Sequence, residues 1–241
     1  MMSSHRSWKF GLVLGVFFMA PNLGMALTLS KTSYLASKNA TIDQATASAV
    51  FSRDLSETKR LPNLGYFSGA LWVKFVIEND SPHPESKLLE LNSPYLSYVE
   101  LFTTTESHDG GLISVGRTGV SLPGSEHHVS HRLPMFKVTV PAQTKQHFLM
   151  GIKSNYPMIV RIKLVDLYQY LIYDRDLQIK CGIFLGIYLV MALYNLFLYL
   201  SLKDGAYFYY SLSIFLVHAT ILLGNYGVFN EYLWPEIPWL K

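Results

Sequence analysis

The nine residues LWVKFVIEN, Leu71–Asn79, decide the fold of the first part of the chain. Apolar residues occupy every second position from Leu71 to Ile77, and the positions between them include Lys74 and Glu78. A period of two is typical of a β-strand, because successive side chains point to opposite faces. The stretch therefore predicts a half-buried strand, with one face in a core and the other toward solvent.

Six further segments have the composition of short strands, and turn residues such as Asp109-Gly110-Gly111 and Pro141-Ala142 separate them. Such spacing, without a helical pattern in between, predicts a mainly β domain: an antiparallel sandwich over residues 27–166. In the last of these segments, Arg161 and Lys163 are expected to point outward. The residues expected to point inward are Met158, Val160, Ile162 and Leu164. Residues 28–67 are less regular and could supply a strand and a short helix. The six segments are KLLELN (87–92), SYVELFTTT (97–105), LISVG (112–116), MFKVTV (135–140), QHFLMGIKS (146–154) and MIVRIKLVD (158–166).

The first 26 residues have the pattern of an export signal. Arg6 and Lys9 precede an apolar core, Phe10–Ala20, that is shorter than the roughly 20 residues needed to cross a bilayer. Small residues at Gly24 and Ala26 fit cleavage after Ala26, and an uncleaved anchor is the alternative. Because the chain has one cysteine, we expect the sandwich in a bacterial periplasm, held by its core without disulfides.

Half of the residues are hydrophobic and only 15% are charged, which indicates a membrane protein with a soluble part. A long apolar run from Cys181 to Leu223 is broken near its middle by Lys203-Asp204-Gly205. Its parts, 181–202 and 206–223, are together about twice too long for one crossing. The run therefore predicts a transmembrane hairpin with its turn on the cytoplasmic side.

The hairpin prediction divides the rest of the chain. Residues 167–180 become a juxtamembrane linker, and residues 224–241 become an extracytoplasmic segment of a truncated bundle. Two polar residues, Asn195 and His218, lie within the apolar helices; such groups are functional hypotheses by default, although helix–helix hydrogen bonding is the other interpretation. The expected partners are the lipid bilayer and either further transmembrane helices or a second copy of the chain.

No motif for catalysis, phosphate binding or nucleic-acid binding is present, so we expect neither an enzyme, a cofactor nor a nucleic-acid partner. His127 and His131 could ligate a metal if they shared a strand face. The turn residues around them favour a solvated loop instead.

Ligand binding by aromatic side chains is the more plausible chemistry. Trp72 lies on the polar side of its strand, and Tyr95 and Tyr98 lie near the start of another. Exposed aromatic rings on a sandwich can stack on sugar rings, so these residues are candidate contacts for a carbohydrate or another small molecule. All three could equally be core residues that pack beneath a second layer.

Four stretches, in order, resemble the bacterial seven-transmembrane receptors with diverse intracellular signalling modules. The resemblance implies a periplasmic jelly-roll sensor of the carbohydrate-binding-module type, then seven helices and a cytoplasmic output module such as a kinase or cyclase. It places Trp72 and Arg132 at marked positions of the sensor, which adds Arg132 to the candidate ligand contacts. The chain departs from the pattern in having two spans and no output module. The stretches are NLGYFSGALWVKFVIENDS (63–81), LLELNSPYLSYVELF (88–102), HRLPMFKVTVP (131–141) and GIFLGIYLVMALYNLFLYLSLKDGAYFYYSLSIF (182–215).

Residues and resemblance together predict the sensor and first hairpin of a signalling receptor in the bacterial inner membrane. A periplasmic ligand would shift the linker 167–180 and the helix that follows it. The alternative is a non-signalling binding module that is tethered to the membrane.

Overall fold

A computed structural model describes residues 27–38, 41–55, 57–58, 61, 63–104, 111–220 and 235–237. The predicted export signal, 1–26, and most of segment 224–241 lie outside these residues. The elements, in chain order, are β1 (Leu27–Lys38), α1 (Gln44–Phe51), β2 (Asn63–Gly65), β3 (Gly69–Asn79), β4 (Glu85–Leu91), β5 (Tyr98–Thr104), β6 (Leu112–Thr118), the 3₁₀ turn η1 (Gly124–Glu126), β7 (Met135–Val140), β8 (Lys145–Lys153), β9 (Met158–Ile159), β10 (Ile162–Val165), α2 (Leu167–Leu202) and α3 (Gly205–Ala219).

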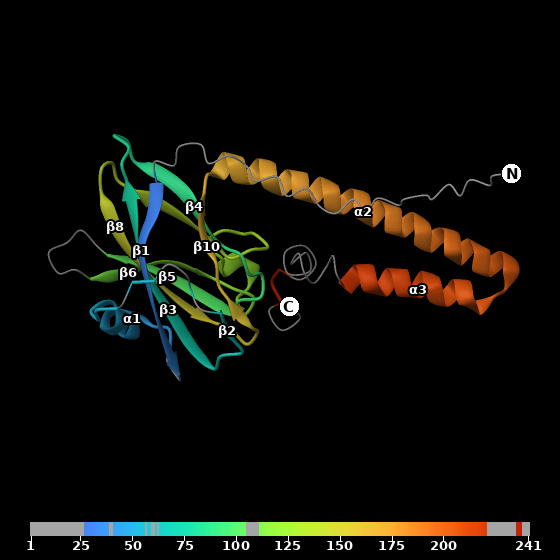
Figure 1. The fold of residues 1–241 in the computed structure, drawn as a ribbon, viewed down its shortest axis with the longest axis horizontal. Coiled ribbons are helices and arrows are strands. Elements are labelled where there is room, and N and C mark those ends of the chain that lie inside the picture. The colour runs from blue at the N-terminus through green and yellow to red at the C-terminus, as the bar shows by residue number, and fades with distance from the viewer. Residues whose placement is uncertain are drawn as a thin grey trace, which may run out of the picture.

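The strands form two facing antiparallel sheets, which confirms the predicted sandwich (Figure 1). One sheet has the order β1-β3-β8-β5-β6 and the other β10-β4-β7, while β2 and β9 pair separately. Because strands adjacent in the chain often lie in different sheets, the connections cross between the layers, as in Greek-key sandwiches. Contacts between segments that are distant in the sequence therefore hold the sandwich together.

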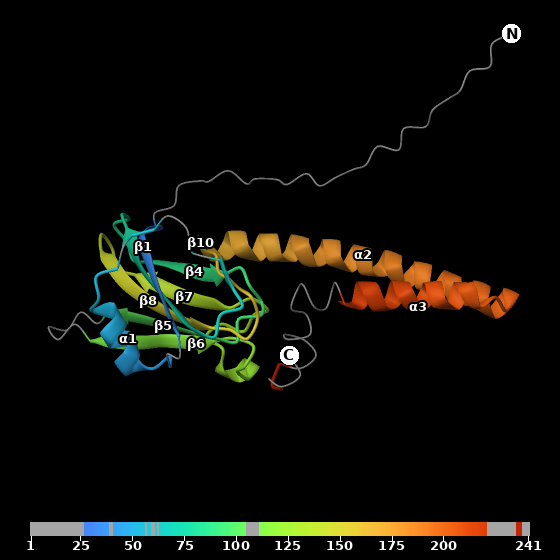
Figure 2. The ribbon, with the colours of Figure 1, turned by 60° about the horizontal axis from the view of Figure 1, so that its bottom comes forward.

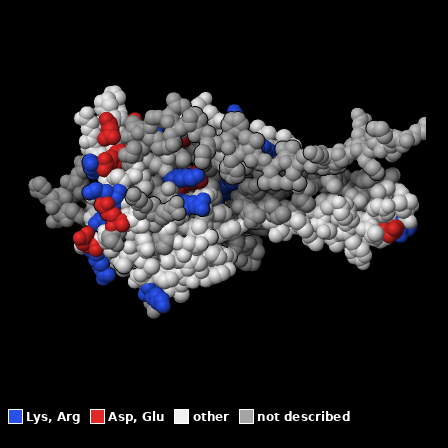
Figure 3. All heavy atoms as spheres, viewed as in Figure 1, with Lys and Arg blue, Asp and Glu red and all other residues white. Residues whose placement is uncertain are grey.

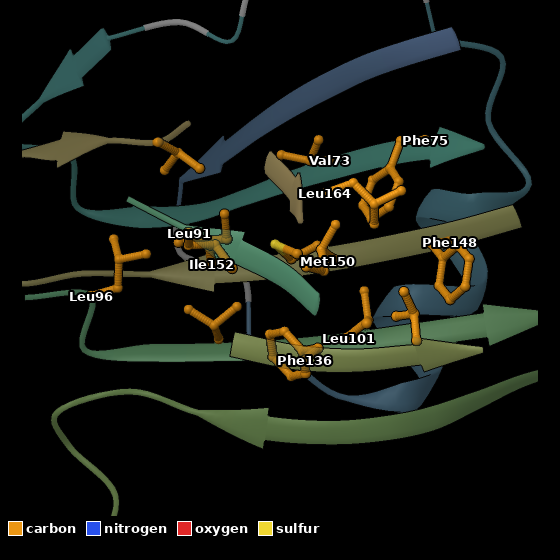
Figure 4. Packing of buried hydrophobic residues seen from close by; sticks show 14 of the residues in the cluster. Val73, Phe75, Leu91, Leu96, Leu101, Phe136, Phe148, Met150, Ile152 and Leu164 are labelled. Atoms are coloured by element: carbon orange, nitrogen blue, oxygen red, sulfur yellow. The ribbon is translucent and has the colours of Figure 1, made fainter. Parts of the chain in front are cut away.

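The main core lies between the two sheets (Figure 4). Alternate residues of β3, from Leu71 to Ile77, are fully buried there, and the Phe75 and Phe148 rings stack with their centroids 5.6 Å apart. From the other sheet, β4 and β7 contribute Leu91 and Phe136. Burial of this many large apolar side chains is the main term that stabilises the sandwich.

The other face of β3 is also covered, so the prediction of a half-buried strand is wrong for this face. Helix α1 and its flanks lie over the five-stranded sheet and bury Trp72 completely, in a second cluster with Phe102 and Leu149. Gly151, the cross-strand partner of Trp72, leaves room for its ring, because a Cβ there would lie 2.9 Å from Trp72 Cζ3. Asp43 caps α1 by accepting a hydrogen bond from the Thr46 N–H at 2.7 Å.

The last predicted strand, 158–166, is two short strands with different partners: β9 pairs with β2, and β10 pairs with β4. The predicted inward and outward directions are nevertheless confirmed, since Arg161 and Lys163 are exposed whereas Met158, Val160 and Leu164 are buried. Alternation of side chains fixes the faces of a segment, but not the strand beside it.

The two C-terminal helices form an antiparallel hairpin, as predicted (Figure 2). Lys203 ends α2 in the left-handed conformation, φ 56°, and the Asp204 carboxylate caps α3 by accepting a hydrogen bond from Ala206 N–H at 3.0 Å. Ser211 Oγ on α3 donates a hydrogen bond to the Ala192 carbonyl on α2 at 2.9 Å. In Figure 3, a neighbouring red and blue group marks the far end of the hairpin, where this turn lies.

Helix α2 has 36 residues and is long and apolar enough to cross a membrane. At 1.5 Å per residue it is about 54 Å long, whereas the hydrocarbon core of a bilayer is about 30 Å thick. The helix therefore extends well beyond the bilayer. The juxtamembrane linker 167–180 is its first four turns, so the linker and the membrane span 181–202 are one continuous rod.

Candidate functional site at the junction of the sandwich and helix α2

The first turns of α2 pack against the outer face of the three-stranded sheet. The Tyr170 side chain is buried there against Leu88 of β4 and Met135 of β7. Figures 1 and 2 both show α2 leaving the sandwich next to β10, the strand that precedes it in the chain. A small apolar cluster, separate from the main core, thus holds the start of α2 against the three-stranded sheet.

The start of α2 is fixed by Asp166, its N-cap. The Asp166 carboxylate accepts a hydrogen bond from Tyr168 N–H at 2.9 Å. It also forms an ion pair with Lys87 of β4, whose Nζ donates a hydrogen bond to it at 3.1 Å. The hydrogen bond from Lys87, more than the backbone bonds, lowers the pKa of the Asp166 carboxyl. This residue therefore connects the sheet to the first turn of the helix.

Asp166 gives a prediction for the helix start. Asp166→Ala removes both the cap and the partner of Lys87, and is expected to destabilise the first turn by about 1 kcal/mol. Asp166→Asn keeps the capping oxygen and should destabilise it less. Hydrogen exchange at the amides of Tyr168 and Gln169 measures this difference, and equal exchange in the two variants would contradict a capping role.

Two turns further along α2, an ion pair joins the helix to the loop before β7. Arg132 Nη2 donates to Asp174 Oδ1 at 2.6 Å, and the two side chains are only 9% and 12% exposed. Gln178 Nε2 donates to the other carboxylate oxygen of Asp174 at 2.7 Å. A short, charge-assisted bond in a buried place is strong and demands a fixed geometry. The pair therefore fastens the sandwich to the outer half of α2.

His131 and Glu90 surround this pair and are also largely buried. His131 Nδ1 accepts a hydrogen bond from Leu133 N–H at 3.0 Å, while its Nε2 lies 3.2 Å from the Tyr170 hydroxyl and 3.7 Å from the Asp174 carboxylate. Burial lowers the pKa of His131 and raises the pKa of the Glu90 carboxyl. Burial thus disfavours the charged form of both groups, while Arg132 and Asp174 form the ion pair at the centre of the junction.

A small cavity of about 30 Å³ lies beside the ion pair. His127, His131 and Arg132 line it, together with Thr118 of β6 and Pro235. The Thr118 hydroxyl oxygen is buried and has no hydrogen-bond partner within the described part of the chain. Polar and apolar atoms both line the cavity, which is large enough for a water molecule, but not for a sugar ring.

Comparison with known families assigns both parts of the chain. The 7TMR-DISM extracellular 2 family model matches residues 31–166, more than half of the chain. The chain belongs to the 7TMR-DISM family. The 7TM diverse intracellular signalling model matches residues 178–241, and a search of curated proteins finds no match. The resemblance noted in the sequence is thus confirmed: a 7TMR-DISM extracellular sensor domain is followed by the seven-transmembrane region of a signalling receptor.

The family assignment also orients the molecule. The 7TMR-DISM sensor, 31–166, is extracellular, and this chain is a membrane protein of the receptor class, not of a known catalytic class. The junction described above bridges the short gap, 167–177, between the two matched regions. It is therefore the place where the sensor of this 7TMR-DISM protein meets its membrane part.

The predicted ligand contacts of the 7TMR-DISM sensor are dispersed in the structure. Trp72 has no exposed surface, so it takes the core position that its strand also allowed, beneath α1. Tyr98 is half-buried and its hydroxyl donates to Glu100 at 2.8 Å; burial, with this bond, raises its pKa to about 12. Tyr95 packs against Tyr156 with ring centroids 5.7 Å apart. Of these aromatic residues, Trp72 is closed to a ligand, whereas Tyr95, Tyr98 and Tyr156 each keep some exposed surface.

The three basic candidates come together around the cavity. The loop predicted for His127 and His131 is confirmed, but its second half is not solvated, because α2 covers it and buries most of the His131 and Arg132 side chains. His127 Nε2 lies 3.1 Å from the Gly119 carbonyl. Among the described residues, no group of three or more metal-binding side chains is present.

Of the two polar membrane residues, the structure describes the side chain of Asn195. Asn195 Nδ2 donates to the Met191 carbonyl, one turn earlier in its own helix, at 2.8 Å. The side chain of His218 lies outside the described part of the structure. Gly182 and Gly186 lie on one face of α2. A Cβ at either position would meet no atom within 4 Å, so α3 does not pack closely against these glycines.

The sequence interpretation missed Asp174, which lies within the stretch that was assigned to the linker 167–180. The available signal was a spacing of four: Asp166, Tyr170, Asp174 and Gln178 share one face of a helix. The spacing becomes meaningful only once the linker 167–180 is known to be helical.

The lowered pKa of His131 gives a prediction for pH. Because its folded pKa lies below the unfolded value of about 6.5, the unfolded chain holds more protons between these two values. The stability that His131 contributes is complete above about pH 6.5 and is lost as the pH falls toward the folded pKa. Thermal unfolding of the full chain in nanodiscs should show a steeper acid loss for the wild type than for His131→Gln.

Glu90 supplies the control for this pH experiment. Its pKa is raised, so its contribution has the opposite sign: it is present below the unfolded pKa of about 4.3 and is lost as the pH rises through the folded value. Glu90→Gln should therefore leave the His131-dependent acid loss in place. Identical profiles for the wild type and His131→Gln would contradict the account.

Proposed function

We propose that this chain is the ligand-sensing and first signal-transmitting part of a receptor in a bacterial inner membrane. The sandwich binds a small polar molecule, of which a carbohydrate is the first class to test, in the periplasm. Binding shifts the loop that carries Arg132, and the shift moves α2 as a rigid rod toward an output module beyond this chain.

One observation carries the proposal. The Asp174 side chain that Arg132 holds belongs to the same unbroken helix that reaches Leu202 at the hairpin turn. A helix is stiff along its axis, so a displacement at its outer turns is transmitted to its far end. Transmission also requires two discrete arrangements of the junction. A buried ion pair, which is made or broken rather than stretched, favours such behaviour.

The surface around Tyr95 is the proposed ligand contact. The Tyr95–Tyr156 pair lies between two loops at one end of the sandwich, and Tyr156 is 41% exposed. Pro94, next to Tyr95, lines the cavity beside Arg132. A ring stacked on these tyrosines would therefore lie next to the loop that holds α2, which gives binding a short path to the junction.

The test uses the full chain in nanodiscs and a panel of neutral hexoses, N-acetylhexosamines and uronic acids. Calorimetry measures binding, and a spin label on Cys181, the only cysteine, reports motion at the outer end of the span. We expect heat for at least one sugar class and a change in label mobility with it. Binding without a change in α2 would favour the tethered module, and no heat for any sugar would contradict the carbohydrate class.

A further inference from the structure

The sandwich makes a second contact, with residues that follow helix α3 of the hairpin in the chain. The Gly124 N–H donates a hydrogen bond to the Pro235 carbonyl at 2.7 Å. Ser125 donates twice to the Glu236 carboxylate, from its N–H at 3.1 Å and from its hydroxyl at 2.9 Å. Three hydrogen bonds thus join the 3₁₀ turn of the sensor to a segment 111 residues away.

The shape of the turn fits this partner closely. A Cβ on Gly124 would lie 3.2 Å from Pro235 Cβ, from the Pro235 carbonyl oxygen and from Glu236 Oε1. Distances this short require the neighbouring atoms to move, so glycine is what lets the segment approach. Glu126, in the same turn, is paired with Arg117 of β6 at 2.7 Å, and this pair offsets its negative charge. The turn offers donors to an incoming carboxylate, and a side chain at Gly124 would fit only if Pro235 or Glu236 moved slightly.

The second contact lies next to the first. Pro235 lines the same cavity as His131 and Arg132, so the cavity is bounded on one side by the α2 junction and on the other by this segment. A change that opens the cavity would displace both contacts together.

We propose that the turn Gly124–Ser125 and the carboxylate of Glu236 form a releasable latch that connects the sensor to the second membrane helix. The sensor would then act on both helices of the hairpin: on α2 by the Arg132–Asp174 pair, and on α3 by the latch. Its partner is the extracytoplasmic loop after α3 in the same chain.

A disulfide trap tests the latch in membranes. In a Cys181→Ser background, Gly124→Cys with Pro235→Cys places the two Cβ atoms about 3.2 Å apart, slightly closer than the roughly 3.5–4.5 Å usual in disulfides. Gly111→Cys with Pro235→Cys is the matched control, because Gly111 lies at the opposite end of β6 and a Cβ there meets nothing within 4 Å. We expect mild oxidation to cross-link the first pair at least about tenfold faster than the control. Equal rates would overturn the latch.

A second measurement does not depend on introduced cysteines. Glu236→Ala should speed hydrogen exchange at the Ser125 amide by about tenfold or more, because the amide loses its acceptor. Glu236→Gln keeps one acceptor oxygen and should speed it less. Gly124→Ala should act like Glu236→Ala, and Gly111→Ala should have no effect on Ser125. Unchanged exchange in Glu236→Ala would also overturn the latch, whatever the Arg132–Asp174 pair does.

Discussion

Replacing Asp174 with alanine is expected to loosen the outer half of α2 from the sandwich and to destabilise this region by about 3–5 kcal/mol. The reason is that Arg132 and His131 remain buried when their carboxylate is removed. Removing one partner of a buried ion pair costs far more stability than removing one partner of a surface pair. Thermal unfolding of the full chain in nanodiscs, together with hydrogen exchange over 167–180, measures the effect.

The chain supplies a matched control in Asp176, two residues further along the same helix. Its carboxylate is 52% exposed and pairs with its neighbour Arg175 at 3.4 Å. Asp176→Ala should therefore change stability by less than about 0.5 kcal/mol. The double change Arg132→Met with Asp174→Leu should recover most of the lost stability, because an apolar pair of similar size carries no desolvation penalty. A single Asp174→Ala variant as stable as Asp176→Ala would contradict the structural role of the pair.

Trp72→Ala is the second change with a large expected effect, about 3–5 kcal/mol of lost stability. The Trp72 ring is fully buried beneath α1 against Phe102, 6.3 Å between centroids, and Gly151 leaves the space that it fills. Alanine would leave a cavity that neighbouring strands cannot close. Denaturant unfolding of the full chain measures the loss. It is monitored by the circular dichroism of the backbone, because this signal does not depend on the Trp72 ring.

A conservative variant separates a core role of Trp72 from a ligand role. The indole N–H is buried without a hydrogen-bond partner among the described residues, so phenylalanine gives up no protein hydrogen bond there. Trp72→Phe should keep the fold with a smaller loss of stability and should bind any sugar as the wild type does. Loss of binding with an intact fold would show that Trp72 reaches the ligand, against the packing described here.

The sequence predicted the sandwich and the hairpin because both depend on local pattern. Alternation along β3 and β10 predicts which residues share a face of the strand. The residues Lys203-Asp204-Gly205 predict the turn between the two apolar helices. The layers above and below the sheets could not be predicted in this way. The outer face at Trp72 is covered by α1. This contact joins segments that are distant in the sequence, so a local pattern does not predict it.

The candidate site was only partly predictable for the same reason. Arg132 and Asp174 are separated by 42 residues, and neither is unusual in its own neighbourhood. The spacing of four along Asp166, Tyr170, Asp174 and Gln178 is visible in the sequence, but it has meaning only on a helix whose partner surface is known. His127 and His131 were chosen for their chemistry and Arg132 for the family resemblance, and the fold brings all three to one cavity beside that helix.

The most direct test of the account is a double-mutant cycle between the sensor and the membrane helix. Arg132→Ala, Asp174→Ala and the double variant are compared in nanodiscs by the free energy of local opening of residues 167–180, from hydrogen exchange. If the buried pair couples the sandwich to α2, the two effects should be non-additive, with a coupling energy of about 1.5–3 kcal/mol. Effects that add to within about 0.5 kcal/mol would show that the sandwich and α2 are not joined through this pair, and would contradict the central claim.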